Sequence, residues 1–382
     1  MPVRSLDLDN WLSTALNGKN ALAIDTSQKI REIGYLGNPA SFTGTYIHYL
    51  AHEAVYFNYE KNIFAEPEEP YDEFIVFDEE IYTGGWAASI SNTIEFPSAE
   101  QMSSYSKMEV ELLRGCPDSN GNYSDAGCDD YDRIARMFVC DLDGSNCKEI
   151  ARWITPFDRQ PHSLTDISPF IATLANGGQK IIKFQESGWP NSLLTMKFRL
   201  YHNTDRQPTP QEFQPMWVGT IPFNPDFDDN TPPIVFEVPD NATKVEFVSY
   251  ITGHGWGCDG MNCAEFCNSK HTFIVNGGVH EFDTSYPEAG DLDYCMEPGT
   301  IVQGVKPNQY GTWGYGRAGW CPGQDVHPMV TDITDYVSIG DENVIDYDGC
   351  RVQGNNCLDP PICQGDGYCP EIAMTSYIIV WY

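Results

Sequence analysis

The sequence predicts an all-β protein made of two adjacent sandwiches, with a small extra module at the N-terminus. Three observations support this: short apolar runs of period two, 26 prolines and 33 glycines distributed among them, and little helical periodicity beyond residues 6–35. Alternating runs bounded by turn residues are typical of half-buried strands, and many short strands in series favour sandwiches or jelly rolls. A chain of 382 residues has room for two such domains.

Nine segments carry the strand pattern, all of them after residue 70. They are Phe74–Phe77, Met108–Leu113, Met137–Val139, Lys180–Phe184, Leu194–Tyr201, Ile234–Val238, Lys244–Tyr250, Thr272–Val275 and Tyr377–Trp381. A polar stretch with two prolines, His202–Gln214, separates two groups of these segments and predicts an interdomain linker. We therefore expect an N-terminal module with two short helices over residues 1–70 and sandwiches over residues 71–205 and 216–382.

The charge of the chain limits its partners. There are 55 acidic and 22 basic residues, a net charge of −33, so phosphate backbones and anionic membrane surfaces are repelled. No apolar run reaches the roughly 18 residues of a membrane-spanning helix, and the first residues have no apolar signal core. Thirteen cysteines in loop-like surroundings indicate disulfides and an oxidising compartment. We expect a secreted or periplasmic protein whose leader has been removed.

Four segments concentrate the residue types that catalysis uses: Cys128–Arg133, Gln185–Trp189, Cys263–Cys267 and Arg317–Gly323. A carboxylate held beside a disulfide and an aromatic side chain has the surroundings that tune a general base. In so acidic a chain most carboxylates are solvated or pair with arginine at the surface. The three-residue spacing between two cysteines singles out Glu265, because a disulfide across so tight a turn fixes the direction of its carboxylate.

Aromatic residues in glycine-rich loops suggest sugar binding. Trp189, Trp256 and Trp320 all lie in such loops, where an indole face stacks on a pyranose ring. Burial in the core is an equally good interpretation for each of them.

The sequence does not predict a metal site or a common hydrolytic motif. Cys258, Cys263, Cys267 and His271 have the spacing C-x4-C-x3-C-x3-H, which is not a usual zinc pattern, and oxidised sulfur does not bind zinc as thiolate does. Neither a G-x-S-x-G motif nor a P-loop is present in the sequence. We expect no metal and no other cofactor.

Some cysteine pairings follow from spacing alone. Cys140 and Cys147 suit a hairpin clip. Four cysteines near the C-terminus, namely Cys350, Cys357, Cys363 and Cys369, allow three connectivities. The odd total of thirteen predicts one free thiol or one intermolecular bridge.

Taken in order along the chain, the four segments resemble the peptide-N-glycosidase F family of bacterial amidases. The similar pieces are Cys128–Arg133, Ile154–Phe157, Glu186 with Gly188–Trp189, Cys263–Cys267, His271–Thr272 and Arg317–Gly323. The similarity runs from about Phe74 to the C-terminus. Tyr131 and Phe266 stand where the family has tryptophan, and the interval from Glu186 to Trp189 is one residue longer.

The resemblance implies two adjacent eight-stranded jelly-roll sandwiches with the active site in the cleft between them. It matches Asp132 to the essential carboxylate, Glu265 and Glu186 to supporting acids, and Arg133 and Arg317 to arginines of the site. It also implies the disulfides Cys116–Cys128, Cys263–Cys267 and Cys295–Cys321. With these pairings Cys258 is the cysteine left over.

The implied activity is hydrolysis of the amide bond that joins N-glycans to asparagine. The implied partners are N-glycosylated proteins and peptides, acted on by a monomer of bacterial origin without nucleic acid or membrane. Two alternatives stay open: a glycoside hydrolase with paired carboxylates, and a non-catalytic glycan-binding or adhesion protein. A copper monooxygenase with related sandwiches is disfavoured because the eight histidines are scattered and form no H-x-H.

Overall fold

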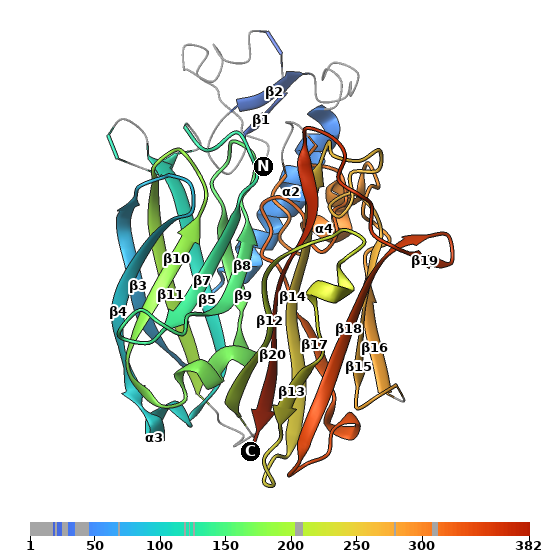
Figure 1. Cartoon of the computed structure of the whole chain (residues 1–382). Helices are drawn as coiled ribbons and strands as arrows, with labels where there is room; N and C mark the ends of the chain where they lie inside the picture. The colour runs from blue at the N-terminus through green and yellow to red at the C-terminus, as the bar shows by residue number, and fades with distance from the viewer. Residues whose placement is uncertain are drawn as a thin grey trace.

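The protein is all-β: in its described residues, four antiparallel sheets form two halves side by side, and a separate two-stranded sheet precedes them in the chain (Figure 1). The computed structural model describes residues 18–19, 21–24, 30–34, 46–67, 69–117, 120–121, 123–124, 127–202, 209–278, 280–307 and 312–382. Within these ranges, every helix is too short or too polar to cross a bilayer.

The first half contains a four-stranded and a five-stranded sheet, in the orders β4-β10-β7-β8 and β3-β11-β5-β6, with β9 also pairing with β5. Its strands are β3 (Tyr71–Tyr82), β4 (Ala88–Ser98), β5 (Tyr105–Pro117), β6 (Tyr123–Ser124), β7 (Ile134–Cys140), β8 (Lys148–Ile154), β9 (His162–Asp166), β10 (Gly177–Glu186) and β11 (Ser192–His202). Two short helices, α3 (Ala99–Met102) and η2 (Ser168–Leu174), connect them.

The second half repeats this plan with the orders β12-β20-β14-β17 and β13-β18-β15-β16, with β19 pairing with β18. Its strands are β12 (Pro210–Pro222), β13 (Ile234–Glu237), β14 (Lys244–Trp256), β15 (Ser269–Val275), β16 (His280–Ser285), β17 (Met329–Asp332), β18 (Glu342–Gln353), β19 (Asn356–Leu358) and β20 (Tyr368–Trp381). Four short helices lie in its loops: η3 (Asp228–Asn230), η4 (Tyr294–Met296), α4 (Pro298–Ile301) and η5 (Thr334–Tyr336).

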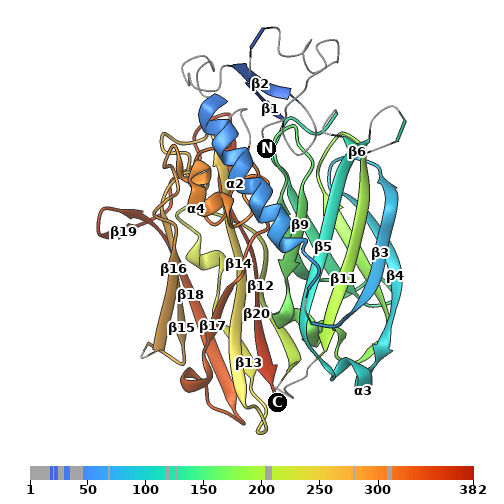
Figure 2. The same ribbon diagram turned by 180° about the vertical axis from the view of Figure 1, so that it is seen from behind.

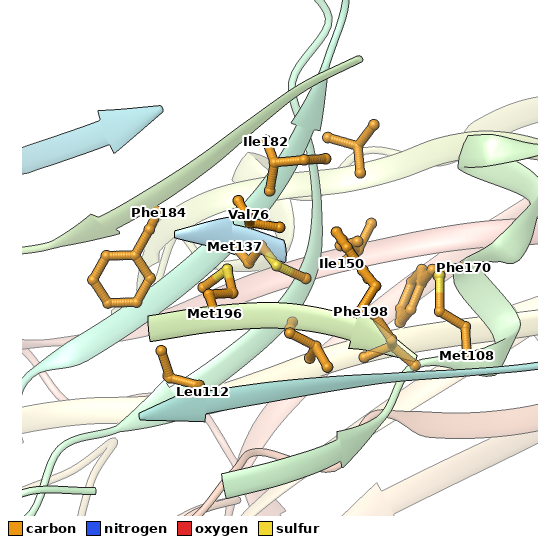
Figure 3. Packing of buried hydrophobic residues seen from close by; sticks show 14 of the residues in the cluster. Val76, Met108, Leu112, Met137, Ile150, Phe170, Ile182, Phe184, Met196 and Phe198 are labelled. Atoms are coloured by element: carbon orange, nitrogen blue, oxygen red, sulfur yellow. The ribbon is translucent and has the colours of Figure 1, made fainter. Parts of the chain in front are cut away.

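Apolar side chains from the two sheets of the first half meet in one core. Phe184 and Ile182 of β10 lie opposite Met196 and Phe198 of β11, with Met137 of β7 among them (Figure 3). All five side chains are fully buried. This is the packing that period-two apolar runs produce when each of two sheets turns one face inward.

The first core continues into the second half instead of ending at its boundary. Tyr250 of β14 and Tyr377 of β20 belong to the same apolar cluster, and their hydroxyls donate to the main-chain oxygens of Ile150 and Glu149 in β8, each at 3.0 Å. Buried Arg152 donates across the boundary to Thr252 Oγ1 at 2.9 Å. A boundary of buried aromatic rings and satisfied polar groups fixes the two halves relative to each other.

Helix α2 (Tyr46–Ile63) lies across both halves on the face seen in Figure 2. Glu53 pairs with Arg159 of the first half at 2.5 Å, and Lys306 of the second half lies 3.8 Å from Glu60. The stacked rings of Phe64 and His162 add a contact to the first half. The helix therefore holds the two halves together from behind.

The described residues of the N-terminal module contain a strand pair as well as a helix. Strands β1 (Ala21–Ile24) and β2 (Ile30–Gly34) form an antiparallel hairpin where helical periodicity was noted, and the described residues of the module contain one helix, α2. The other residues before Tyr46, apart from 18–19, lie outside the described ranges. A β hairpin satisfies its backbone by cross-strand pairing and needs no amphipathic face, so side-chain periodicity did not reveal it.

The predicted linker is shorter than expected. Residues 210–214 open strand β12, where Phe213 pairs in register with Ile379 of β20. Residues 203–208 lie outside the described ranges. The polar composition of this segment reflects one solvated face of an edge strand, and not a break in the fold.

The disulfides agree with the expectations at four pairs: Cys116–Cys128, Cys140–Cys147, Cys263–Cys267 and Cys295–Cys321. Of the C-terminal four, Cys350 pairs with Cys357. Cys258 is not left apart, because it lies within bonding reach of Cys363, which also lies within reach of Cys369.

Candidate active site

A cavity of about 1130 Å³ opens at the junction of the two halves. Its walls come from strand ends and loops at one end of both sandwiches. The first half contributes Trp86, the segment 130–134, Arg136, Ile154, Phe157 and Gln185–Ser187, and the second contributes Thr220, His254–Trp256, Glu265, Phe266, Thr312, Arg317, Trp320, Asp366–Tyr368 and Glu371. Seven of the eight predicted site residues lie in this lining, and Trp189 is the exception.

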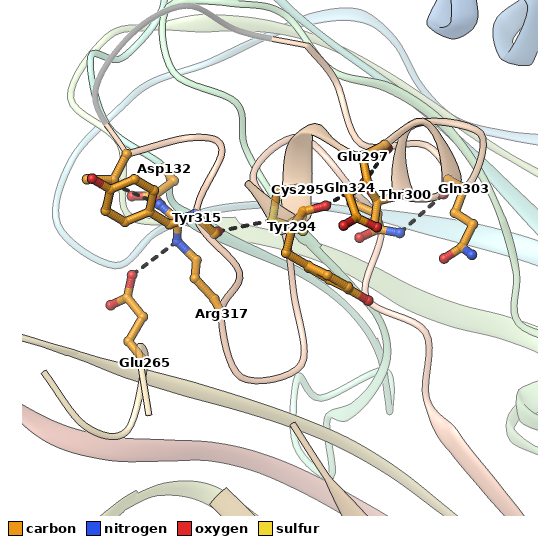
Figure 4. Close-up of a disulfide and its surroundings, with 12 residues drawn as sticks. Asp132, Glu265, Tyr294, Cys295, Glu297, Thr300, Gln303, Tyr315, Arg317 and Gln324 are labelled. Carbon is orange, nitrogen blue, oxygen red and sulfur yellow. Dashed lines mark hydrogen bonds and ion pairs between the residues drawn. A yellow bond between two sulfur atoms is a disulfide. The ribbon is translucent and has the colours of Figure 1, made fainter. Parts of the chain in front are cut away.

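The guanidinium of Arg317 lies between two carboxylates from opposite halves of the molecule (Figure 4). Its Nε donates to Glu265 Oε1 at 3.2 Å, and its Nη2 lies 3.6 Å from Asp132 Oδ2. Asp132 lies two residues before the start of β7, whereas Glu265 comes from the loop after β14. The junction thus assembles a carboxylate–guanidinium–carboxylate group that neither half contains alone.

Hydrogen bonds and aromatic rings fix the position of the Arg317 guanidinium. Nη1 donates to the main-chain oxygen of Tyr315 at 2.8 Å, and Nη2 donates to Thr312 Oγ1 at 3.0 Å. The guanidinium lies 4.7 Å from the centre of the Trp320 ring and 5.1 Å from that of Phe266. With only 1% of its surface exposed, this side chain has one fixed position in the cavity wall.

Burial raises the pKa of the Asp132 carboxyl above its ordinary value, and the nearby positive charge of Arg317 opposes that rise. About a fifth of the side chain, 21%, remains exposed to the cavity. A carboxylate that is reachable from solvent and more basic than usual suits proton abstraction.

The pKa of the Glu265 carboxyl is raised above its ordinary value to about 7. Burial is the main cause of the rise, and the positive charge of Arg317 opposes it. The negative charge of Asp132 raises this pKa further. Its Oε2 accepts from the main-chain N–H of Gly255 at 3.1 Å. The site therefore changes its charge near neutral pH.

Short-range geometry explains why Glu265 points inward. The disulfide between Cys263 and Cys267 closes the loop on both sides of it. Its main-chain oxygen accepts from the N–H of Ala318 at 2.9 Å, which ties this loop to the one carrying Arg317. Gly253 is required beneath, since a Cβ there would lie 2.3 Å from the oxygen of Ala264.

Glu186 lies in the lining but its carboxylate is engaged elsewhere. It accepts two hydrogen bonds from Arg114, at 2.6 Å from Nη2 and 3.1 Å from Nε, and the whole pair is buried. Burial raises the pKa of Glu186, with Arg114 opposing. Gly188 packs directly on this carboxylate, because a Cβ there would lie 2.7 Å from Glu186 Oε1. The pair supports the turn after β10.

Arg133 pairs with Asp129 and not with its neighbour Asp132. Two bonds join them, from Nε to Oδ2 at 3.0 Å and from Nη2 to Oδ1 at 3.2 Å. The same buried carboxylate accepts from the main-chain N–H of Tyr131 at 3.1 Å and of Trp189 at 3.3 Å. Asp129 is therefore an organising residue of the site that the sequence interpretation missed. Its position directly after Cys128 was the one signal available.

The three predicted tryptophans have different positions. Trp256 is half exposed in the cavity wall, and its ring meets Phe266 edge to face at 5.3 Å. Trp189 is 67% exposed and lies beyond the cavity lining. Trp320 is 93% buried, beneath Arg317, and its indole N–H donates to the oxygen of Gly253 at 2.9 Å. Of these three, Trp256 alone is both in the cavity lining and substantially exposed.

Three other residues of the cavity lining bear on its chemistry, and the sequence analysis did not single them out as site residues. Trp86, in the β3–β4 turn, and Tyr368, at the start of β20, are both more than half exposed. Tyr368 pairs in register with Trp256, so two aromatic side chains stand together on one wall. His254 has its pKa lowered to about 3 by burial and by Arg152, and so it stays neutral. The position of Tyr368 in the cavity wall depends on pairing with a strand about 110 residues away in the sequence, and no local sequence pattern predicts this pairing.

The alternative zinc set does not assemble. Cys263 and Cys267 are joined to each other, and His271 accepts or donates only to Ser269 and Tyr347 among the described contacts. In the described ranges, the one group with metal-ligand spacing is Cys258, Cys363 and Cys369, and it includes neither Asp132 nor Glu265.

Comparison with known proteins gives one family. A family model described as peptide-N-glycosidase F, C terminal, matches residues 222–379. The chain is 24% identical over 269 residues to the peptide-N(4)-(N-acetyl-beta-D-glucosaminyl)asparagine amidase F of Elizabethkingia miricola, covering 65% of this chain and 68% of the relative.

Solved structures give the same result for the fold. PNGase F, described as a glycosylasparaginase from Flavobacterium meningosepticum, superposes with a TM-score of 0.59 at 20% identity, covering 82% of this chain and 96% of its own. PNGF-II superposes with a TM-score of 0.59 at 13% identity, covering 81% of this chain and 65% of its own. The all-β arrangement in two halves is therefore shared with proteins of quite different sequence.

Proposed function

Because the chain belongs to the peptide-N-glycosidase F family, we propose that it hydrolyses the β-aspartylglucosaminyl amide bond between N-glycans and asparagine. Membership supports an N-glycan amidase function in general, with glycoproteins or glycopeptides as substrates. The observation that carries the specific reaction is the position of Arg317 between Asp132 and Glu265, in a cavity with exposed aromatic walls.

The first step is the activation of water. Amide hydrolysis needs a nucleophile, and Asp132 is the exposed carboxylate whose pKa burial has raised. It takes a proton from a water molecule as the water oxygen attacks the side-chain carbonyl carbon of the substrate asparagine. The carbonyl oxygen becomes an oxyanion in this step.

Arg317 and Glu265 assist this step in different ways. The guanidinium, fixed by Tyr315 and Thr312, offers charged hydrogen bonds to the developing oxyanion. Ionised Glu265 accepts from the water or from a hydroxyl of the core N-acetylglucosamine. The carbon–nitrogen bond then breaks, and the nitrogen leaves with the proton that Asp132 received.

The products are a peptide with aspartate in place of asparagine and a 1-amino oligosaccharide, which loses ammonia in water. Trp256 stacks on a sugar ring in the cavity, and Arg133 and Trp320 act through the loops that they support. Glu186 is a positioning residue, since its carboxylate is occupied by Arg114. We propose that the enzyme works as a monomer outside the cytoplasm, where its disulfides persist.

Mass measurement of a treated glycopeptide tests the reaction directly. The amidase converts asparagine to aspartate and releases the entire glycan. A glycoside hydrolase instead leaves at least one sugar on asparagine, and a binding protein leaves the glycopeptide intact. Either of these two outcomes with a folded protein overturns the proposal.

A further inference from the structure

Parity leaves one of the thirteen cysteines of this sequence without a partner among the other twelve. Of thirteen cysteines, ten form five separate pairs, listed here: Cys116–Cys128, Cys140–Cys147, Cys263–Cys267, Cys295–Cys321 and Cys350–Cys357. The remaining three are Cys258, Cys363 and Cys369, whose sulfur atoms all lie within 4.8 Å of one another. The unpaired sulfur therefore belongs to this cluster, which we call the cysteine triad.

Cys363 has two possible partners in the triad. Its Cα lies 5.4 Å from that of Cys258 and 5.5 Å from that of Cys369, both within the range of disulfides. The sulfurs of Cys258 and Cys369 lie 3.5 Å apart. Since a sulfur forms one disulfide at a time, either pairing leaves a thiol in contact with the bond. Contact between a thiol and a disulfide is the requirement for exchange.

Main-chain contacts as well as sulfur bonds hold the backbone around the triad. The N–H groups of Gln364 and Gly365 donate to the oxygen of Cys258, at 3.3 and 3.0 Å. A Cβ on Gly367 would lie 2.2 Å from the oxygen of Trp256, so glycine is needed for this close approach. Because main-chain contacts position the loop, both pairings are compatible with one backbone arrangement.

We propose that the triad is a thiol–disulfide exchange site in the cleft wall, in which one disulfide alternates between Cys258–Cys363 and Cys363–Cys369. The thiolate of Cys369 attacks Sγ of Cys363, the Cys363–Cys369 bond forms, and the Cys258–Cys363 bond breaks. Cys258 leaves as a thiolate and takes a proton from solvent. The reverse step restores the first state, and no oxidant or reductant is consumed.

The two states differ in what they show to solvent. Cys258 is 4% exposed, whereas Cys369 is exposed at the surface. Exchange therefore moves the thiol between a protected and an accessible position. The accessible state accepts low-molecular-weight disulfides: the Cys369 thiolate attacks such a molecule, forms a mixed disulfide, and releases a small thiol. Tyr368 and Asp366 line the cavity beside it, so the adduct lies at the cleft wall.

Peptide mapping tests the exchange without any measurement of glycan turnover. Unreduced native protein is acidified, which stops exchange because the thiolate is the attacking species, and is then labelled with N-ethylmaleimide in guanidinium chloride. We expect one label per chain, divided between Cys258 and Cys369, with none on Cys363. A label confined to one residue, or found on Cys363, overturns the proposal.

Two matched variants and a control sharpen the test. Cys258→Ser and Cys369→Ser each leave an even number of cysteines, so both proteins are expected to take up no label and no glutathione from oxidised glutathione. The native protein is expected to take up one glutathione, at Cys369. Cys350→Ser is the control and is expected to add a second label at Cys357. Uptake of label by Cys258→Ser at Cys369 would show that Cys363 does not exchange partners.

Discussion

Glu265 and Arg317 are joined by a 3.2 Å ion pair, yet the pKa of Glu265 is raised to about 7. An ion pair alone lowers the pKa of a carboxyl, so burial and the nearby Asp132 outweigh it here. The positive charge of the Arg317 guanidinium is shared between the carboxylates of Asp132 and Glu265, and it does not offset the burial of either one. This explains how the site can hold a proton near neutral pH beside a permanent positive charge.

The first prediction is a loss of stability as pH rises from about 4.5 to about 7. In this range Glu265 is protonated in the folded protein and ionised in the unfolded one, so the folded state binds more protons and the free energy of unfolding falls. Above pH 7 this contribution is absent. Thermal melts of the wild type and Glu265→Gln from pH 4 to 8 measure it. The difference between the two proteins is expected to change over this range, and a constant difference contradicts the assignment.

The second prediction concerns the rate. If ionised Glu265 orients water or substrate, kcat/KM rises as pH passes through about 7, because only the ionised form accepts hydrogen bonds at both oxygens. Glu265→Gln is expected to lose this pH dependence as well as activity. Rates on one glycopeptide at low substrate concentration, measured from pH 5 to 9, give the profile. A wild-type profile that is flat around pH 7 would remove Glu265 from the reacting group.

The third prediction is that Asp132→Asn abolishes glycan release while the fold is retained. The amide has the same shape as the carboxylate but cannot accept a proton, so we expect a loss of at least about a hundredfold in kcat. Asp78→Asn, at an exposed position of β3 outside the cavity lining, is the control and is expected to keep its activity. Circular dichroism checks the fold, and near-normal turnover by Asp132→Asn would refute the assignment of the base.

The fourth prediction separates activity from stability at one disulfide. Replacing both Cys263 and Cys267 by Ser opens a ring only four residues apart in sequence, which the loop-length model values at about 2 kcal/mol. A displacement of the Glu265 carboxylate by about 1 Å can cost on the order of a hundredfold in rate. We expect a small drop in Tm and a large drop in kcat. Full activity with a collapsed Tm would show that Gly255 and Ala318 suffice to place Glu265.

The fifth prediction ranks the aromatic residues. Trp256→Ala and Tyr368→Ala remove the paired rings of one cavity wall, so each is expected to raise KM several-fold, in line with the roughly 1 kcal/mol of an aromatic contact. Trp189→Ala is expected to change KM less, because this side chain lies beyond the lining. Initial rates over a range of glycopeptide concentrations decide. The opposite ranking would place the glycan on the outer face of the first half.

The sequence predicted the central strands well because their apolar faces are continuous. The runs at 180–184 and 194–201 lie within β10 and β11, and both are buried on the inward face. Strand β18 escaped prediction because its pattern is inverted: Asn343 is buried and Val344 is partly exposed. Asn343 satisfies its amide by donating to the main-chain oxygens of Ser338 and Asp341. These neighbouring main-chain oxygens allow a polar side chain to be buried, which a search for alternating apolar residues does not predict.

The same reasoning applies to the site. The cysteine spacing pointed to Glu265, and the family resemblance added Asp132 and Arg317; the structure brings these three together in one group. The sequence did not show that Arg133 binds Asp129, or that Arg114 occupies Glu186. Each of these choices depends on which carboxylate a strand end presents to which arginine, and so on pairing between distant strands.

The apolar core that runs from the first half into the second has a consequence for engineering this protein. Tyr250 and Tyr377 would lose their cover, and Ile150 and Glu149 would lose hydrogen-bond donors, if the chain were cut between the halves. Exchanging one half alone between related proteins is therefore expected to disrupt this shared core. A chimeric protein that keeps its stability must take the contacting surface of β8 and the strands β14 and β20 from the same parent protein.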